Sequence, residues 1–170
     1  MTNRSGSERV TVFTVGALMG LPGAVPSIMS TDCTFCRIVE GDLPSRTVYE
    51  DREVEAFLDA NPLAPGHTLV VPKAHYERLN DLPEDPALSV LETLYRLLDP
   101  VERAVEADAT TIAFNNGRAA GQEIPHVHGH VIPRFEGDGG GPVHGVVPSR
   151  PNLSAAELDD IAAQVADGLD

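Results

Sequence analysis

The chain has 170 residues, of which 42% are hydrophobic, and this is enough for a single domain with one core. Twelve Lys and Arg residues stand against 26 Asp and Glu residues, giving a formal net charge of −14 at pH 7. This balance argues against binding to nucleic acid or to anionic lipid, because both need a basic face. The absence of tryptophan and an aromatic content of 5% also disfavour a base-stacking surface.

The basic residues are unevenly chosen, because Lys73 is the only lysine and all the others are arginine. A dense surface of carboxylates is tolerated at about 1 M salt, where the Debye length falls to about 3 Å and like charges stop repelling one another. We therefore expect a cytoplasmic protein from a halophile.

The first 28 residues differ from the rest, because their only charges are Arg4, Glu8 and Arg9. The apolar run Val10–Leu21 weakly resembles a signal peptide, but Gly and Pro interrupt the segment. The alternative is a disordered N-terminal extension over residues 1–28, followed by one domain over residues 29–170. No apolar run reaches about 18 residues, so we expect no membrane-spanning helix.

Strands and helices are predicted along the rest of the chain. A helical turn follows Cys33–Cys36, and clustered or alternating apolar residues predict five short strands, at Thr47–Tyr49, Val54–Asp59, Thr68–Val71, Thr110–Phe114 and His126–Phe135. Apolar residues at steps of three and four predict an amphipathic helix between Pro86 and Ala107. Pro100 clashes with the carbonyl of Arg96 in such a helix, which predicts a kink or two helices. Ser154 and Glu157 predict the start of a last helix that ends at about Leu169.

The segment from Pro125 to Pro133 contains three histidines in alternate positions, His126, His128 and His130. On a strand, residues at this spacing lie on one face. Three bulky polar rings gain nothing from a solvated strand face, so the alternation indicates chemistry. A metal site formed by the three histidines alone is one interpretation, since neighbouring histidines on a strand face can reach one zinc ion.

The loop before these histidines, Asn115–Glu123, favours another interpretation. It offers glycines and neutral amides, which can present backbone N–H groups to a phosphate without net positive charge. By itself the loop is typical of an ordinary hairpin connection. Together with the histidines it predicts a phosphate site.

The sequence His-Val-His-Gly-His-Val-Ile resembles the alternating motif of the histidine triad (HIT) superfamily of nucleotide hydrolases and transferases. The resemblance extends from about residue 33 to residue 135 and includes Cys33–Val39, Ala56–Asp59 and Pro65–Lys73. It implies an α+β fold in which a long helix packs on an antiparallel sheet of about five strands. It also implies a homodimer and a purine nucleotide, or a conjugate of one, as the bound ligand.

The resemblance implies a role for each matching residue. His128 matches the nucleophile that attacks the α-phosphorus and forms a nucleotidyl-imidazole, while His130 and His67 match residues that assist at the leaving group. The positions that match nucleotide-binding residues are Asp59, for the ribose hydroxyls, and Asn115, Gly121, Gln122 and Glu123, for the phosphate oxygens.

Two positions depart from the pattern of the family. Glu123 stands where many relatives carry Ser or Thr, and a carboxylate there repels phosphate unless it is protonated or turned away. Gly129 stands where a larger apolar residue is usual. The handling of the leaving group and the choice of substrate are therefore open.

Cys33 and Cys36 are the only cysteines, and their spacing allows one disulfide or half of a zinc site. The HIT branch that resembles galactose phosphate uridylyltransferases has zinc ligands at the positions of Cys33, Cys36, His75 and His126. This likeness implies a structural zinc ion. A redox-active pair and two metal-free thiols are the alternatives.

The leading hypothesis is a hydrolase that releases a nucleoside monophosphate from a phosphoramidate, a dinucleoside polyphosphate or a related conjugate. Hydrolysis is favoured over nucleotidyl transfer because no second substrate site is visible in the sequence. The alternatives are a nucleotide-binding regulatory protein with little turnover and a zinc-dependent or thiol-dependent redox protein.

Overall fold

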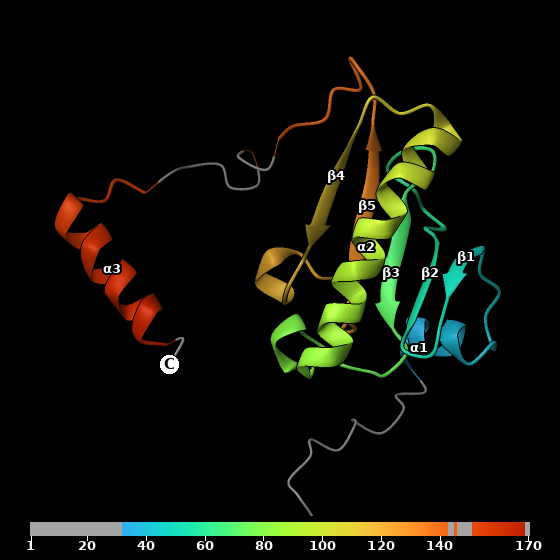
Figure 1. Ribbon diagram of the computed structural model, residues 1–170, viewed down its shortest axis with the longest axis horizontal. Coiled ribbons are helices and arrows are strands. Elements are labelled where there is room, and N and C mark those ends of the chain that lie inside the picture. Colours follow the sequence, from blue (N-terminus) through green and yellow to red (C-terminus); the bar gives the residue numbers. More distant parts are fainter. Residues whose placement is uncertain (1–31, 143–144, 146–150, 169–170) are drawn as a thin grey trace, which may run out of the picture.

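The computed structural model describes residues 32–142, 145 and 151–168 (Figure 1). The extension expected over residues 1–28 lies outside this range. The main helices and strands are, in chain order, α1 (Thr34–Val39), β1 (Thr47–Glu50), β2 (Val54–Leu58), β3 (Thr68–Pro72), α2 (Glu84–Val105), β4 (Ala109–Phe114), β5 (Gly129–Arg134) and α3 (Ala155–Asp167). Two short 3-10 helices, η1 (Leu79–Asp81) and η2 (Arg118–Ala120), lie in the connections. No helix within the described ranges is long and apolar enough to cross a membrane.

The five strands form one antiparallel sheet in the order β1-β2-β3-β5-β4. The long helix α2 lies across one face of this sheet, as Figure 1 shows. The α+β fold and the helix packed on five strands are therefore confirmed.

Each face of the sheet has its own apolar cluster, because neighbouring residues along a strand point to opposite sides. On the side of α2, Val54, Ala56 and Val70 pack with Leu94 and Val101. On the opposite side the cluster contains Cys33, Phe35, Cys36, Phe57, Leu69 and Val71. The helix thus fills one face, and the other face is left for α1 and for the site.

Helix α2 runs through Pro100 as one element, so of the two alternatives, a kink or two helices, the second is wrong. Leu97 and Val101 are buried on either side of the proline, which holds both halves of the helix on the same core. Pro100 and Arg96 are exposed, so the carbonyl that loses its helical hydrogen bond faces water.

Strand β5 begins at Gly129 and not at His126, which corrects the predicted start. The backbone N–H of Val127 donates to the carbonyl of Tyr76, in the loop after β3, at 2.7 Å. This long-range bond keeps residues 126–128 out of the regular strand pairing. His130 is therefore the one histidine of the three that lies within β5.

Gly129 allows a close approach of two layers. A Cβ atom at this position would lie 2.8 Å from Leu94 Cδ1 on α2 and 2.8 Å from Phe114 Cζ on β4. The volume of a larger apolar side chain is thus occupied by Leu94 and Phe114. This explains why the residue between His128 and His130 is glycine.

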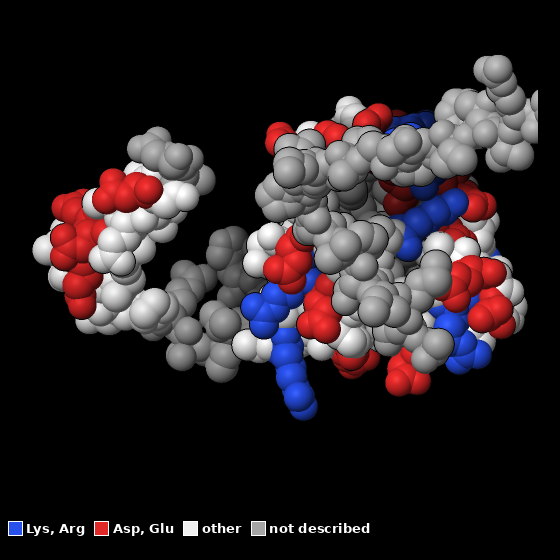
Figure 2. Space-filling view, turned by 90° about the horizontal axis from the view of Figure 1, so that it is seen from below, with Lys and Arg blue, Asp and Glu red and all other residues white. Residues whose placement is uncertain are grey.

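The last helix, α3, begins with the predicted capping box. The Ser154 side chain accepts a hydrogen bond from the Glu157 backbone, and the Glu157 carboxylate accepts one from the Ser154 backbone. Every described residue of α3 is exposed, so this helix adds nothing to the core. Acidic side chains cover much of its surface and are spread over the face of the sheet domain in Figure 2.

Candidate active site and metal centre

The side of the sheet opposite α2 contains a cavity of about 420 Å³. Its apolar part is formed by Phe35, Ile38, Phe57 and Leu63. The predicted site residues that border it are Asp59, His67, Asn115, Gly121, Glu123, His128 and His130. Seven of the eight predicted catalytic and nucleotide-binding residues are thus brought together.

The imidazole of His128 has a fixed tautomer. Its Nδ1 atom lies 2.7 Å from the carbonyl oxygen of His126. Because a carbonyl only accepts hydrogen bonds, the proton of neutral His128 is on Nδ1 and the lone pair is on Nε2. This arrangement leaves a nucleophilic nitrogen on a ring that borders the cavity.

His67 and His130 are coupled by a hydrogen bond of 3.0 Å between His67 Nε2 and His130 Nδ1. The backbone N–H of Leu63 donates to His67 Nδ1 at 3.2 Å, so the proton of His67 is on Nε2 and donates to His130. His130 must then carry its own proton on Nε2. That atom is buried and has no partner among the described residues, so His130 offers a free N–H donor beside the cavity.

Burial keeps these rings neutral. Desolvation lowers the pKa of His130 to about 4, with a further contribution from His128, and it also lowers the pKa of His67. A neutral His130 donates from Nε2 and accepts at Nδ1, which is the arrangement that the hydrogen bonds require. The two neighbouring rings, His128 and His130, therefore present different groups, a lone pair and a proton.

Asp59 lies at the end of β2, where it joins the histidines to the apolar part of the cavity. One of its carboxylate oxygens accepts from the backbone of Asn61 at 2.8 Å, and the other lies 3.5 Å from His67 Nδ1. The carboxylate is partly exposed and borders the cavity. It is thus available to accept hydrogen bonds from hydroxyl groups of a ligand.

Gln122 is the one predicted nucleotide-binding residue that the structure leaves outside this cavity. Its Oε1 atom accepts from the backbone of Gly117 at 2.7 Å, and its Nε2 atom donates to the carbonyls of Glu77, Ile124 and His126. The side-chain amide is therefore fully used in shaping the loop. The structure gives it no free group for a phosphate.

A second cluster lies at the other end of the histidine segment. The donor atoms of Cys33, Cys36, His75 and His126 all lie within 4.8 Å of one another. The distances between donors are 3.2 Å from Cys36 Sγ to His75 Nδ1, 3.2 Å between the two Nδ1 atoms, and 3.4 and 3.5 Å from His126 Nδ1 to the two sulfurs. Tetrahedral zinc with bonds of about 2.0–2.3 Å needs edges of about 3.3–3.6 Å between two nitrogens or between nitrogen and sulfur. The cluster fits that ion.

The protonation of His126 also suits a metal ligand. Its Nε2 atom lies 2.9 Å from the carbonyl of Pro72, so the proton is on Nε2 and the Nδ1 lone pair faces the sulfurs. Burial lowers the pKa of His126 to about 4 and, together with Cys33, raises the pKa of Cys36 to about 12. A thiolate at Cys36 therefore needs a cation beside it.

Phe35 lies between the two clusters. It was not predicted from the sequence as a site residue. The centroid of its ring lies 5.1 Å from the ring centroid of His128, and 5.8 Å from the ring centroids of His126 and Phe57. Its place between the two cysteines on a helical turn was the available signal. Phe35 thus forms the wall between the metal cluster and the cavity.

The family model of the HIT domain matches residues 40–137. The chain belongs to the HIT family. A HIT-like protein of Methanocaldococcus jannaschii is 49% identical over 107 residues, which cover 63% of this chain and 82% of that protein. The histidine motif and the fold therefore agree with the resemblance read from the sequence.

Two further relatives are informative about chemistry. The adenosine 5'-monophosphoramidase of Saccharomyces cerevisiae is 35% identical over 111 residues, covering 65% of this chain and 68% of that enzyme. A crystal structure of a zinc-bound histidine triad protein from Mycobacterium smegmatis superposes with a TM-score of 0.60 at 34% identity, covering 81% of this chain and 97% of that chain. Members of the family thus include a hydrolase and a zinc-bound protein.

Proposed function

We propose that this protein is a nucleotide hydrolase that releases a nucleoside monophosphate from a phosphoramidate, a dinucleoside polyphosphate or a related conjugate. The observation that carries the proposal is the pair of fixed tautomers in one cavity. His128 offers a lone pair on Nε2, and the adjacent His130 offers a proton on Nε2. A displacement at phosphorus needs both groups.

In the proposed reaction, the Nε2 atom of His128 attacks the α-phosphorus and the bond to the leaving group breaks. His130 donates its Nε2 proton to the leaving atom or to a phosphate oxygen, while His67 holds the His130 ring through Nδ1. Water then attacks the phosphorus of the nucleotidyl-imidazole, and the bond from phosphorus to His128 Nε2 breaks. The proton that the water loses returns to Nε2 of His130, and the monophosphate and free His128 are released. Each half-reaction forms one bond to phosphorus and breaks one.

The nucleoside is assigned to the part of the cavity beside Phe35 and Phe57, with a purine against the apolar rings. Asp59 would accept hydrogen bonds from the ribose hydroxyls. Asn115, Gly121 and Glu123 line the same cavity, and the Asn115 amide and the backbone of this loop would contact the phosphate oxygens. Gln122 would act through the shape of the loop.

We assign a closed structural zinc site to Cys33, Cys36, His75 and His126. The bound ion would supply a fixed link between α1 and the histidine segment, without an open position for substrate. Two reduced cysteines used in this way are compatible with a reducing compartment, and we place the protein in the cytoplasm.

We also propose a homodimer. Leu88, Leu91 and Tyr95 are exposed at steps of three and four along α2, and Ile112 is exposed on β4, one of the two edge strands of the sheet. Exposed apolar side chains on one helix face and on an edge strand are typical of an interface between subunits. Sedimentation should show a dimer that Leu91→Glu converts to a monomer.

The proposed activity is tested with a panel of substrates at high salt, comparing adenosine and guanosine phosphoramidates with dinucleoside polyphosphates. Release of the nucleoside monophosphate from at least one member is expected. A protein that binds nucleotides with normal affinity but turns over none of the panel would favour the regulatory alternative.

A further inference from the structure

A second cavity, of about 580 Å³, lies next to the first. It is lined by Glu77, Arg78, Gly117, Arg118, Gln122, Glu123 and Pro125. Glu123 borders both cavities, so the second one begins where the loop after β4 passes the histidines. A ligand that extends past Glu123 would therefore reach both cavities.

The backbone that carries Arg78 is fixed to this loop by side-chain hydrogen bonds. Asn116 Oδ1 accepts from the backbone of Leu79 at 2.9 Å, and Gln122 Nε2 donates to the carbonyl of Glu77 at 2.7 Å. These bonds come from both sides of Gly117. The function of the Gln122 amide is therefore to hold the residues around Arg78 in place.

The guanidinium group of Arg78 packs against the backbone of Gly117. A Cβ atom at Gly117 would lie 3.4 Å from Arg78 Nε and 3.5 Å from Cζ, and the φ angle of +98° is one that favours glycine. The bare backbone thus lets the arginine lie directly against the loop.

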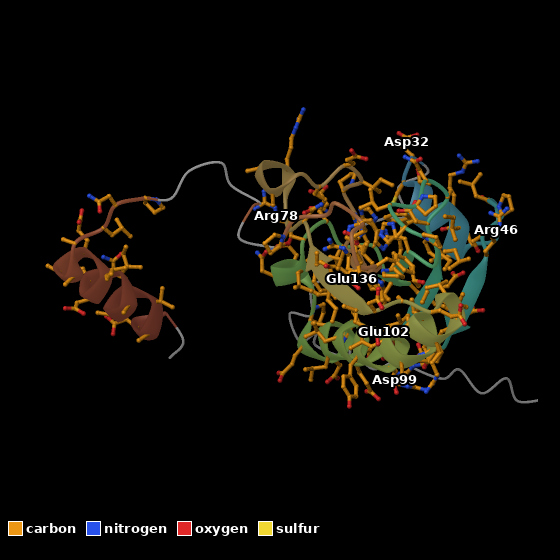
Figure 3. The ribbon with its side chains drawn as sticks, turned by 90° about the horizontal axis from the view of Figure 1, so that it is seen from above. Asp32, Arg46, Arg78, Asp99, Glu102 and Glu136 are labelled. Carbon is orange, nitrogen blue, oxygen red and sulfur yellow. The ribbon has the colours of Figure 1, made fainter. Side chains whose placement is uncertain are left out.

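Arg78 is also a cation without an acidic partner. Within residues 32–142 and 151–168, neither Arg78 nor Arg118 forms an ion pair, although the chain has a net charge of −14. Figure 3 shows Arg78 beside η2, on the other side of the sheet domain from Arg46, which borders the first cavity. Arg78 borders the second cavity together with Arg118. The carboxylates of Glu77 and Glu123 lie in the same lining, and neither is within ion-pair distance of Arg78.

We propose that the second cavity binds the phosphate groups beyond the one that His128 attacks, with Arg78 as the residue that selects an anionic leaving group. The proposal rests on the proposed function and narrows it to phosphoanhydrides. In this reaction the bridging P–O bond breaks and its electron pair leaves with the distal phosphate. Arg78 neutralises the charge that develops on that oxygen. A neutral amine leaving group has no such charge and gains nothing from Arg78.

Binding gives the first test, with AMP and ADP as probes of the zinc-loaded protein. ADP should bind about tenfold more tightly than AMP because of one charge-assisted interaction, and Arg78→Ala should remove that difference. Arg103→Ala is the matched control, because it changes the net charge equally and its partner, Asp99, lies on α2 away from the cavities. This control should keep the preference for ADP.

Turnover gives the second test, with diadenosine triphosphate and an adenosine phosphoramidate of a neutral amine. Arg78→Ala should lower kcat/KM about tenfold for diadenosine triphosphate and leave it within about twofold for the phosphoramidate. Equal losses for both substrates, or an unchanged preference for ADP, would overturn the role of Arg78. If neither AMP nor ADP binds to the wild-type protein, the proposed function itself is wrong, and the inference falls with it.

Discussion

The two histidine clusters use the same side chain for opposite purposes. In the cysteine–histidine cluster, the carbonyl of Pro72 accepts a hydrogen bond from Nε2–H of His126. The free lone pair on Nδ1 faces two sulfurs and His75. At the cavity, the carbonyl of His126 accepts a hydrogen bond from Nδ1–H of His128. The free lone pair on Nε2 belongs to a ring that borders the cavity. Backbone carbonyls thus decide which nitrogen is available, and the groups opposite that nitrogen suit it to the proposed role, as a metal ligand for His126 and as a nucleophile for His128.

The largest effect is expected from His128→Ala. Loss of the proposed nucleophile should reduce turnover by several orders of magnitude, because the covalent route through its Nε2 lone pair is lost. His130→Ala removes a proton donor and should cost about 10²–10⁴-fold. Steady-state kinetics with the best substrate of the panel measures both variants. A His128→Ala enzyme that is more active than His130→Ala would break the assignment.

The metal cluster is tested by zinc content and Tm in place of turnover. His75→Ala should lose about one zinc ion per chain, measured by elemental analysis of protein purified without a histidine tag. Its Tm should fall by about 10 °C or more, because α1 loses its link to the histidine segment. His128→Ala is the matched control and should keep both metal and Tm. An unchanged Tm in metal-free His75→Ala would refute a structural role.

Gly129, between His128 and His130, gives a test of the packing behind the proposed catalytic residues. Gly129→Ala places a methyl group 2.8 Å from Leu94 Cδ1 and Phe114 Cζ and should destabilise the fold by about 1–3 kcal/mol. The second substitution Phe114→Leu should restore part of that loss by making room. Urea denaturation of the single and double variants measures the effect. A Gly129→Ala protein as stable as the wild type would show that this contact is not tight.

The pH dependence of stability separates buried His130 from an exposed ring. Its folded-state pKa of about 4 lies below the value of about 6.5 in an unfolded chain. The unfolded state therefore binds more protons between these values, and the free energy of unfolding should fall as the pH is lowered from about 6.5 to about 4. His130→Gln should weaken this dependence. An NMR titration that places the midpoint of His130 near 6.5 would contradict its burial as a neutral donor.

The smallest effect is expected from salt, which acts on the acidic surface and on neither cluster. After residue 28 the chain has 25 acidic and ten basic residues, so carboxylate repulsion should lower Tm at low ionic strength. Raising potassium chloride from about 0.1 M to about 2 M should raise Tm by a few degrees. A flat or falling Tm would count against adaptation to high salt.

The family, the fold class and the residues of both clusters were predictable because they lie in short local motifs. The His-x-His-x-His spacing and the Cys33–Cys36 pair are visible without any knowledge of the chain path. The register of β3 against β5 then pairs Leu69 with His130 and so brings the preceding His67 next to the histidine segment. Local sequence patterns thus identified the histidines and cysteines of the two clusters, and the pairing of the strands brings His67 and His130 together.

The errors come from bonds between distant segments. The Val127–Tyr76 hydrogen bond delays β5 to Gly129, and the common core under Leu97 and Val101 keeps α2 in one piece. The amide of Gln122 is directed to the carbonyl of Glu77, which periodicity cannot reveal. Arg78 was not predicted as a site residue for the same reason, because it packs against the backbone of Gly117, which is 39 positions further along the chain.

The central claim, that His128 supplies the free lone pair while His130 supplies the proton, is tested most directly by locating the covalent intermediate. Protein mixed with a radiolabelled substrate and quenched within one turnover should carry the nucleotidyl group on a peptide that contains residues 126–130. Fragmentation should place the label on His128. Label recovered on His130, or labelling that persists in His128→Ala, would contradict the account.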